Sequence, residues 1–175
     1  MQTGLMIWTV GHSNQPAAAL IEMLAGAGIE LLVDVRRYPM SRRNPQFNRE
    51  TLAATLAQDS IGYLHAPELG GRREPNADSS NTALRDAGFR GFADYMTTPE
   101  FESALRALIE NAQQRRTAIM CAESLPWRCH RSLISDALVA RGIEVEHLMG
   151  GKTRTHMLTP SARAEDGRVS YPGLL

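Results

Sequence analysis

The chain has 175 residues, a length that suits one folded domain. Hydrophobic residues make up 43% of the chain and charged residues 22%, which excludes a wholly disordered protein. No apolar run approaches the ~20 residues of a membrane span, and the N-terminus shows no secretory signal. Two cysteines cannot build a disulfide framework, so we expect a cytoplasmic protein with no membrane partner.

The charges balance overall but are unevenly placed along the chain. The 19 basic and 19 acidic residues disfavour a general nucleic-acid binder that depends on a strongly positive field. Lys152 is the only lysine, and seven arginines lie between residues 36 and 73, where three acidic residues oppose them. Codon bias explains arginine in place of lysine but not this clustering, whereas a planar fork of donors suits carboxylate and phosphate groups.

Strand-like and helix-like segments alternate from the N-terminus. Residues 6–10 are apolar and partly β-branched, which predicts a strand that ends at residues 11–14. A helix follows, with Pro16 in its first turn and a stop near Gly26. Residues 29–35 are almost continuously apolar, which is typical of a strand that is covered on both faces.

The middle of the chain combines short regular elements with long loops. The polar, arginine-rich residues 36–48 predict a loop, residues 49–58 a modest helix and residues 61–65 a third strand. Residues 66–88 form a long excursion, and a loop of that length in a compact domain is usually functional or mobile. Thr98-Pro99 then marks the start of a further helix.

The alternation continues as far as a fifth strand. Residues 117–121 predict the fourth strand, a helix starts at about Arg128, and residues 143–148 predict the fifth strand. We therefore expect a single α/β domain at residues 1–149, followed by a C-terminal tail or flap at residues 150–175. The alternation predicts a three-layer architecture, with a mainly parallel five-stranded sheet and helices on both faces.

Each predicted strand ends in side chains that can do chemistry. In an open parallel sheet, ligands bind beyond the carboxyl ends of the strands. The residues at these ends are His12, Ser13, Asp34, Arg36, His65, Cys121, Glu123 and His147. A lone histidine at a strand end is more often structural, but the coincidence across five strands predicts one shared active site.

The segment 121–131 carries the highest density of reactive groups. It joins a strand to a helix, and we expect Cys129 in the first helical turn, where free amides and the helix dipole favour an anion. Arg128, His130 and Arg131 add nearby positive charge, a setting that lowers a thiol pKa. The alternative is that both cysteines of the segment pack as small buried hydrophobic residues.

Strand–loop–helix thiol enzymes, such as phosphatases and sulfurtransferases, offer a comparison for this segment. The loop from Cys121 to Arg128 has no glycine, and Pro126 removes an amide donor. Glu123 also places a carboxylate where a phosphate dianion would lie, so a plain phosphate cradle is disfavoured. Glu123 fits better as a general base, as the partner of an arginine, or as an acceptor for a ligand hydroxyl or amine.

A metal site is a second interpretation of the same residues. Cys121, Cys129 and His130, together with His12 or His65, could supply soft and borderline ligands. The spacing contains no Cys-x-x-Cys pair, and the neighbouring arginines oppose a cation. We therefore expect no metal at this site.

Several motifs occur in a fixed order along the chain. They are Thr9-Val10-Gly11-His12-Ser13, Leu32-Val33-Asp34-Val35-Arg36, Pro39-x-Ser41-Arg42, Tyr63-x-His65, Leu69-Gly70-Gly71, Met120-Cys121-x-Glu123 and Cys129-His130-Arg131. With these motifs the chain resembles the domain-of-unknown-function 488 family over residues 6–149. The resemblance implies a small bacterial or archaeal cytoplasmic α/β domain without a settled activity, and it supports the site while leaving the reaction open.

The first functional hypothesis is an enzyme that acts on an anionic small molecule, such as a nucleotide or a sugar phosphate. Its nucleophile would be Cys129 or Cys121. The other catalytic candidates are His12, His65, Glu123 and Asp34. The candidates for holding the anion are Arg36, Arg42, Arg131, Ser13 and His130.

Two alternatives belong to other classes of protein. One is a nucleic-acid-binding module that grips phosphates with the arginine-rich loop 36–49 and with Gly70–Arg73. The bases of the nucleic acid would stack on exposed aromatic residues, for which the candidates are Trp127, Phe47 and Tyr38. The other is a thiol redox or metal-sensing protein that uses Cys121 and Cys129.

Overall fold

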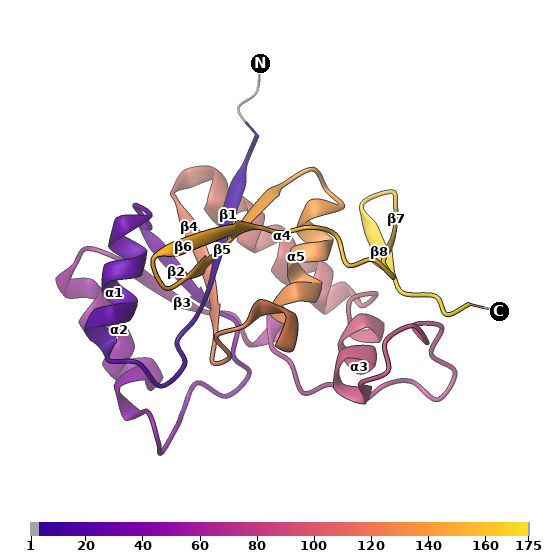
Figure 1. Cartoon of the computed structure of the whole chain (residues 1–175), viewed down its shortest axis with the longest axis horizontal. Coiled ribbons are helices and arrows are strands. Elements are labelled where there is room, and N and C mark those ends of the chain that lie inside the picture. Colours follow the sequence, from indigo (N-terminus) through magenta and orange to yellow (C-terminus); the bar gives the residue numbers. More distant parts are fainter. Residues whose placement is uncertain (1–3, 175) are drawn as a thin grey trace.

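A computed structural model describes residues 4–174 of the chain (Figure 1). Its main sheet contains β1 (Met6–Gly11), β2 (Leu31–Asp34), β3 (Gly62–His65), β4 (Thr117–Cys121), β5 (Glu144–Met149) and β6 (Lys152–Thr155). The α-helices are α1 (Ala17–Gly26), α2 (Arg49–Gln58), α3 (Ala87–Tyr95), α4 (Pro99–Gln114) and α5 (Arg131–Val139). Three short 3₁₀ helices and a small hairpin complete the described elements: η1 (Pro45–Phe47), η2 (Pro67–Leu69), η3 (Pro126–Arg128), β7 (Arg163–Glu165) and β8 (Arg168–Ser170).

The main sheet has the strand order β3-β2-β4-β1-β5-β6. Its first five strands by sequence pair in parallel, and β6 pairs antiparallel with β5. The predicted α/β class and mainly parallel sheet are confirmed, but the sheet has six strands where five were expected. Every residue of β6 is exposed and polar, so this strand has no apolar alternation; it forms because Gly150-Gly151 turns the chain back along β5.

Helices cover both faces of the sheet, as predicted. On one face, the leucines of α1 and α2 pack against Trp8 and Val10 of β1. On the other face, α3, α4 and α5 pack against Ile7 of β1 and Ile119 of β4. The strands in the middle of the sheet are therefore buried on both sides, which explains their nearly continuous apolar sequences.

The segment that was expected to be a tail or flap contains regular structure. Besides β6 it forms the β7–β8 hairpin, and Tyr171 beyond that hairpin is fully buried. The hydroxyl of Tyr171 donates to Asp136 of α5 over 2.7 Å, and its backbone amide donates to the side chain of Asn81 over 2.9 Å. The segment around Tyr171 is thus held against the helical layer by specific hydrogen bonds.

Helix α5 starts later than the sequence suggested. Residues 126–128 form η3 instead of the first helical turn, because Pro126 favours an extended conformation at Leu125 and then opens a separate 3₁₀ turn. Cys129 has an extended backbone, with φ −135° and ψ 149°, and α5 begins at Arg131. The expectation that Cys129 lies in the first turn of the helix is therefore wrong.

The two central strands β1 and β4 create a crevice at the carboxyl edge of the sheet. The chain leaves β1 toward α1 on one face and leaves β4 toward α5 on the other face. Such a divergence between adjacent parallel strands is the usual ligand-binding position in doubly wound folds. The two departing loops are joined by backbone hydrogen bonds, from His12 to Cys121 over 3.0 Å and from Ser13 to Ala122 over 2.9 Å.

Gly11 is required for this close approach of the two loops. A Cβ atom at Gly11 would lie 1.9 Å from the carbonyl oxygen of Glu123, which is backbone and cannot rotate away. We expect Gly11→Ala to lower the free energy of unfolding by about 2–3 kcal/mol, the upper part of the range for overpacking. Gly26→Ala is the matched control, because a Cβ there meets nothing within 4 Å and alanine favours a helix. Equal stabilities of the two variants in urea denaturation would contradict this account.

Candidate active site

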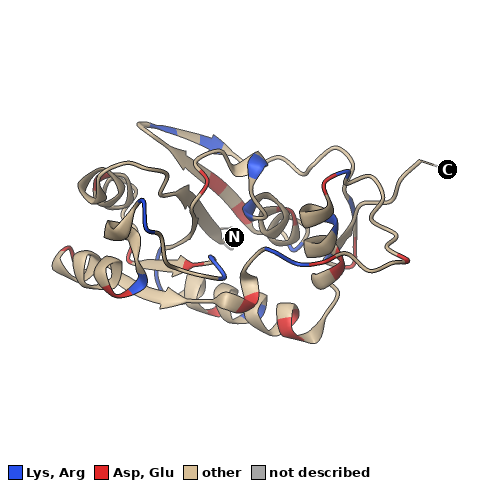
Figure 2. Cartoon of the chain, turned by 90° about the horizontal axis from the view of Figure 1, so that it is seen from below, with Lys and Arg blue, Asp and Glu red and all other residues tan. Residues whose placement is uncertain are grey.

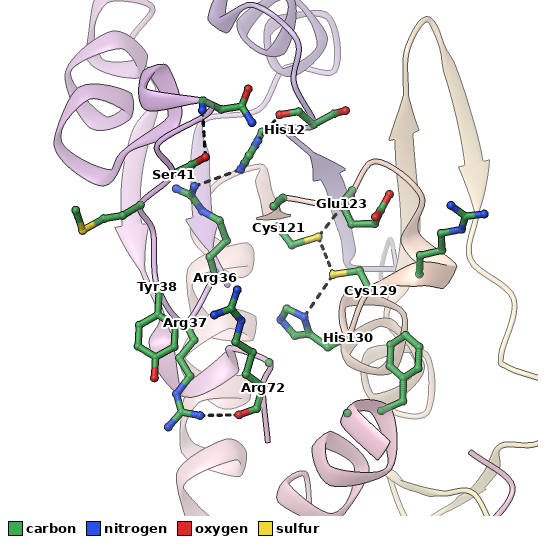
Figure 3. A pocket seen from close by; sticks show the side chains of 18 of the residues that line it. His12, Arg36, Arg37, Tyr38, Ser41, Arg72, Cys121, Glu123, Cys129 and His130 are labelled. Carbon is green, nitrogen blue, oxygen red and sulfur yellow. Dashed lines mark hydrogen bonds between the residues drawn. The ribbon is translucent and has the colours of Figure 1, made fainter. Parts of the chain in front are cut away.

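A pocket of about 710 Å³ opens at the crevice between the central strands (Figure 3). This volume falls within the ~300–1,000 Å³ of typical small-molecule sites. Its walls come from the loops after β1, β2 and β4, together with two stretches of the long excursion, Gly71–Arg72 and Asp86–Phe89. The sheet edge therefore gathers segments that are far apart in the sequence.

The pocket has two chemically different walls. Figure 3 shows Arg36, Arg37 and Arg72 on one side, and the two cysteines with His130 facing them from the other side. Four arginines lie among the lining residues, against the two acidic residues Asp86 and Glu123: Arg36, Arg37, Arg72 and Arg128. The electrostatics of the pocket thus favour an anion.

Asp34 is fully buried and serves as a clamp for Arg36. Its Oδ1 accepts hydrogen bonds from the Arg36 backbone amide (3.1 Å) and Nε (2.9 Å), and its Oδ2 accepts from Nη2 of Arg36 over 2.7 Å. The Tyr63 hydroxyl donates to the same Oδ2 over 2.5 Å. Burial, reinforced by this hydrogen bond, raises the pKa of Tyr63 well above its ordinary value. All these contacts orient Arg36, and none points Asp34 toward the pocket.

His12 holds the same arginine from another direction. Its Nδ1 donates to the Ser13 carbonyl over 2.7 Å, so its Nε2 accepts from Nη1 of Arg36 over 3.3 Å. The ring stacks on Phe47 at 4.4 Å between centroids, and burial lowers the pKa of His12. Nη2 of Arg36 also donates to the Phe47 carbonyl. Four of the five N–H groups of Arg36 are therefore engaged, and one remains for a ligand.

The two cysteines face each other across the base of the pocket. The thiol of Cys129 donates to Cys121, with 2.7 Å between the sulfurs, and the Cys121 thiol lies 3.5 Å from the Glu123 carbonyl oxygen. The hydrogen bond from Cys129 is the main cause that lowers the pKa of Cys121, and Arg131 lowers it further. The same contact with Cys121, together with burial, raises the pKa of Cys129 well above its ordinary value. Cys121 is therefore the more easily ionised of the two.

His130 presents an unprotonated nitrogen to this pair. Its Nε2 lies 3.1 Å from the Val35 carbonyl, which can only accept, so Nε2 carries the proton. Burial lowers the pKa of His130 to about 4, and the ring is neutral near pH 7. Its Nδ1 lone pair then lies 3.4 Å from the sulfur of Cys129, within reach of the thiol proton.

Arg131 is a buried cation without a carboxylate partner. Its side chain is 1% exposed, and Nη2 donates to the backbone carbonyls of Glu123 (3.1 Å) and Ser124 (3.2 Å). Within residues 4–174 its Nε and Nη1 have no hydrogen-bond partner, and no acidic side chain forms an ion pair with it. Because Cys121 approaches the same Glu123 carbonyl, the guanidinium and this thiol lie close together.

The structure brings seven of the eleven predicted site residues to the pocket: His12, Ser13, Arg36, Cys121, Glu123, Cys129 and His130. The other four do not line it: Asp34, His65, Arg42 and Arg131. His65 donates from Nε2 to the Arg36 carbonyl over 2.8 Å, and Arg42 is exposed. Oε1 of Glu123 accepts from the backbone amide of Leu125 over 3.3 Å, which holds the carboxylate at the loop.

The arginine-bearing wall also contains Arg37 and Arg72, which were not among the predicted site residues, and Tyr38, which was predicted only as an aromatic residue for base stacking. Nη1 of Arg37 donates to the Arg72 carbonyl over 2.8 Å, and both guanidinium groups lie 5.7 Å from the ring centre of Tyr38. The signal for Arg37 and Arg72 was the arginine clustering itself. Nothing in the sequence showed that the loop after β2 meets residues 71–72 of the long excursion.

A buried network of hydrogen-bonded side chains lies outside the pocket. Thr9 donates to His147 Nδ1 (2.5 Å), Nε2 of His147 donates to His156 Nδ1 (2.9 Å), and Nε2 of His156 donates to Asp136 (2.7 Å). This direction follows from the carboxylate, which accepts only. Burial, followed by the influence of His156, lowers the pKa of His147 to about 3. This hydrogen-bond network connects the C-terminal segment to α5 and β1.

The described part of the chain carries neither a metal-binding cluster nor a membrane-spanning helix. Residues 4–174 contain no group of three or more His, Cys, Asp or Glu side chains placed to hold a metal ion. Among the same residues, no helix combines the length and the apolar character needed to cross a bilayer.

The fold and the pocket define a doubly wound α/β protein with a thiol- and arginine-lined site at its topological switch point. The chain belongs to the family described as Domain of unknown function DUF488, whose model matches residues 16–138. The match includes both cysteines and the arginine-rich loop, while His12 and Ser13 precede it. No curated protein and no solved structure matches the chain significantly.

The Asp34–Arg36 clamp is testable by stability. Asp34→Asn leaves the 8%-exposed Arg36 without its counter-charge, and we expect a loss of about 3–5 kcal/mol in the free energy of unfolding. Tyr63→Phe removes one hydrogen bond from the same carboxylate and should cost only about 1 kcal/mol. The clamp is not supported if urea denaturation shows Asp34→Asn to be no more harmful than Tyr63→Phe.

The neutral buried histidines predict a pH dependence of stability. In the folded protein the pKa values of His130 and His147 are lowered to about 4 and about 3, from an ordinary value of 6.5. At a pH between the lowered pKa values of the folded protein and 6.5, the unfolded chain binds more protons than the folded protein. The free energy of unfolding therefore rises with pH in this range. We expect the melting temperature to fall as the pH decreases from 6.5 to about 4. His147→Asn should show a shallower slope, and an unchanged slope would contradict the assignment.

Proposed function

We propose that this protein is a cysteine-dependent enzyme that acts on a small anionic substrate, with Cys121 as its nucleophile. The observation that carries the proposal is the buried guanidinium of Arg131, which donates to the same Glu123 carbonyl that Cys121 approaches at an arginine-lined pocket. Ionisation of one thiol supplies a nearby negative charge to Arg131, which forms no ion pair with an acidic side chain among residues 4–174. A buried charge without compensation is costly, so this pairing favours the thiolate.

Cys121 is the better candidate for that thiolate. It approaches the carbonyl oxygen to which Arg131 donates, and it accepts the hydrogen bond of Cys129. Cys129 keeps its proton in this arrangement and stabilises the negative sulfur. Cys121 is thus the nucleophile, and Cys129 is the hydrogen-bond donor that keeps the nucleophile ionised.

The substrate must carry a negative charge and an electrophilic centre. Arg37, Arg72 and Arg128 are lining residues that are free to approach an anion, and Arg36 keeps one N–H group for it. The Cys121 sulfur would form a bond to the electrophilic centre, and the leaving group would depart with its electron pair. Glu123, whose carboxylate lies at the pocket, would then activate the water that releases the product.

A nucleic-acid-binding role has weaker support. Tyr38 and Trp127 are 59% and 50% exposed, and arginine side chains lie over both rings. The expectation that Phe47 is also exposed for stacking is wrong, because its side chain is fully buried. Lys and Arg are, however, interspersed with Asp and Glu along the ribbon (Figure 2), and the net charge is zero. A long polyanion depends on a continuous basic surface, so we favour a small anion in the pocket.

Alkylation with two reagents of opposite electrostatic character tests this proposal. Iodoacetate is an anion and iodoacetamide is neutral, but both react with a thiolate. We expect one label per chain near neutral pH, mapped to Cys121 by peptide mass. For each thiol, the rate with iodoacetate is divided by the rate with iodoacetamide. We expect this ratio to be roughly tenfold higher for Cys121 than for free cysteine, which corresponds to about 1.4 kcal/mol of electrostatic preference. Inorganic phosphate should slow the iodoacetate reaction.

A matched pair of variants separates the pocket from general surface charge. Arg128→Ala should reduce the preference for iodoacetate, because Arg128 lines the pocket. Arg42→Ala should leave it unchanged, because Arg42 is exposed and does not line the pocket. The proposal fails if Cys121 reacts no faster than free cysteine, or if both variants behave alike.

A further inference from the structure

The two cysteines are placed to react with each other as well as with a substrate. Their sulfurs are 2.7 Å apart, less than one ångström beyond a disulfide bond of about 2.05 Å. Both are free thiols, and both border the pocket from which a reagent can reach them. We infer that Cys121 and Cys129 form a reversible intramolecular disulfide, which inactivates the nucleophile until it is reduced.

The local backbone permits this bond. Cys121 is the last residue of β4 and is fixed by the sheet. Cys129 lies in an extended link between η3 and α5, outside any regular helix. A small adjustment of this link brings the sulfurs into bonding distance without disturbing the strand or the helix.

The pocket also suits an oxidant of a particular class, a low-molecular-weight disulfide that carries carboxylates. The lining arginines would attract such an anion toward the thiols. The Cys121 thiolate attacks one sulfur of the small disulfide, a new S–S bond forms, and the first small thiolate leaves. The protein then carries a mixed disulfide at Cys121.

Cys129 completes the exchange with the help of His130. The Nδ1 lone pair of His130, 3.4 Å from the Cys129 sulfur, accepts the thiol proton. The Cys129 sulfur attacks the Cys121 sulfur, and the second small thiolate leaves and takes up the proton. In the balance, two protein thiols are oxidised to one disulfide while the small disulfide is reduced to two thiols.

Arg131 makes the disulfide easy to reverse. In the reduced protein a thiolate stabilises the buried guanidinium, whereas the disulfide is neutral and removes that stabilisation from a cation that has no ion-pair partner among residues 4–174. Stabilising the reduced form in this way makes a disulfide more oxidising. The bond is therefore expected to respond to the thiol pool instead of serving as a permanent staple.

The test uses glutathione disulfide and intact-protein mass spectrometry. After incubation, we expect the wild-type mass to fall by two hydrogen atoms, with no free thiol left for iodoacetamide and full recovery with dithiothreitol. Cys129→Ser should stop at one glutathione adduct on Cys121, because the second thiol is missing. His130→Asn should lower the rate of adduct resolution relative to the rate of adduct formation in the same variant. Wild-type protein that keeps two free thiols, or Cys129→Ser protein without an adduct, would overturn the inference.

The loss of nucleophile activity on oxidation rests on the proposed function, but formation of the disulfide does not. If iodoacetate shows its preference for Cys121 while no disulfide forms, the proposed function stands and the inference fails. If the disulfide forms while iodoacetate shows no preference, the inference stands and the anionic-substrate proposal fails. Each outcome is thus decided by a separate measurement.

Discussion

The guanidinium of Arg131 is buried under the loop after β4, and no acidic side chain among residues 4–174 pairs with it. Two backbone carbonyls take one of its nitrogens, which satisfies hydrogen bonds but supplies no negative charge. The thiols of Cys121 and Cys129 lie near enough for this positive charge to favour their ionised forms. The proposed nucleophile, its division of labour with Cys129 and the reversible disulfide all follow from this one constraint.

The buried charge of Arg36, unlike that of Arg131, is paired with a carboxylate. Arg36 has its own carboxylate in Asp34, and His12 and the Phe47 carbonyl occupy further donors. This arginine is fixed in place, with its charge already balanced. The less constrained arginines of the same wall, Arg37 and Arg72, keep their charge for a ligand. The pocket thus contains one arginine, Arg36, that is fixed by its own counter-charge, and two arginines, Arg37 and Arg72, whose charge is available to a ligand.

The fold class and the edge of the sheet where the candidate site lies could be predicted from the sequence, because apolar strands buried on both faces are recognisable and their carboxyl ends must meet. Strand β6 was missed, because its exposed polar residues give no periodicity, although Gly150-Gly151 was a hairpin signal. Cys129 was also predicted inside a helix that begins two residues later. The burial of Arg131 and the role of Asp34 as a clamp depend on tertiary contacts between distant segments, which residue types and spacing do not encode.

The charge state of Cys121 is the most direct measure of this account, and the ultraviolet absorbance of the thiolate reports it without any reagent. Titration of the native protein should show one thiolate per chain that persists well below the pH at which free cysteine ionises. The signal should vanish in Cys121→Ser and shift to higher pH in Cys129→Ala, which removes the hydrogen-bond donor. A wild-type protein whose thiols both ionise only at or above the pH of free cysteine would contradict the pairing of Cys121 with Arg131.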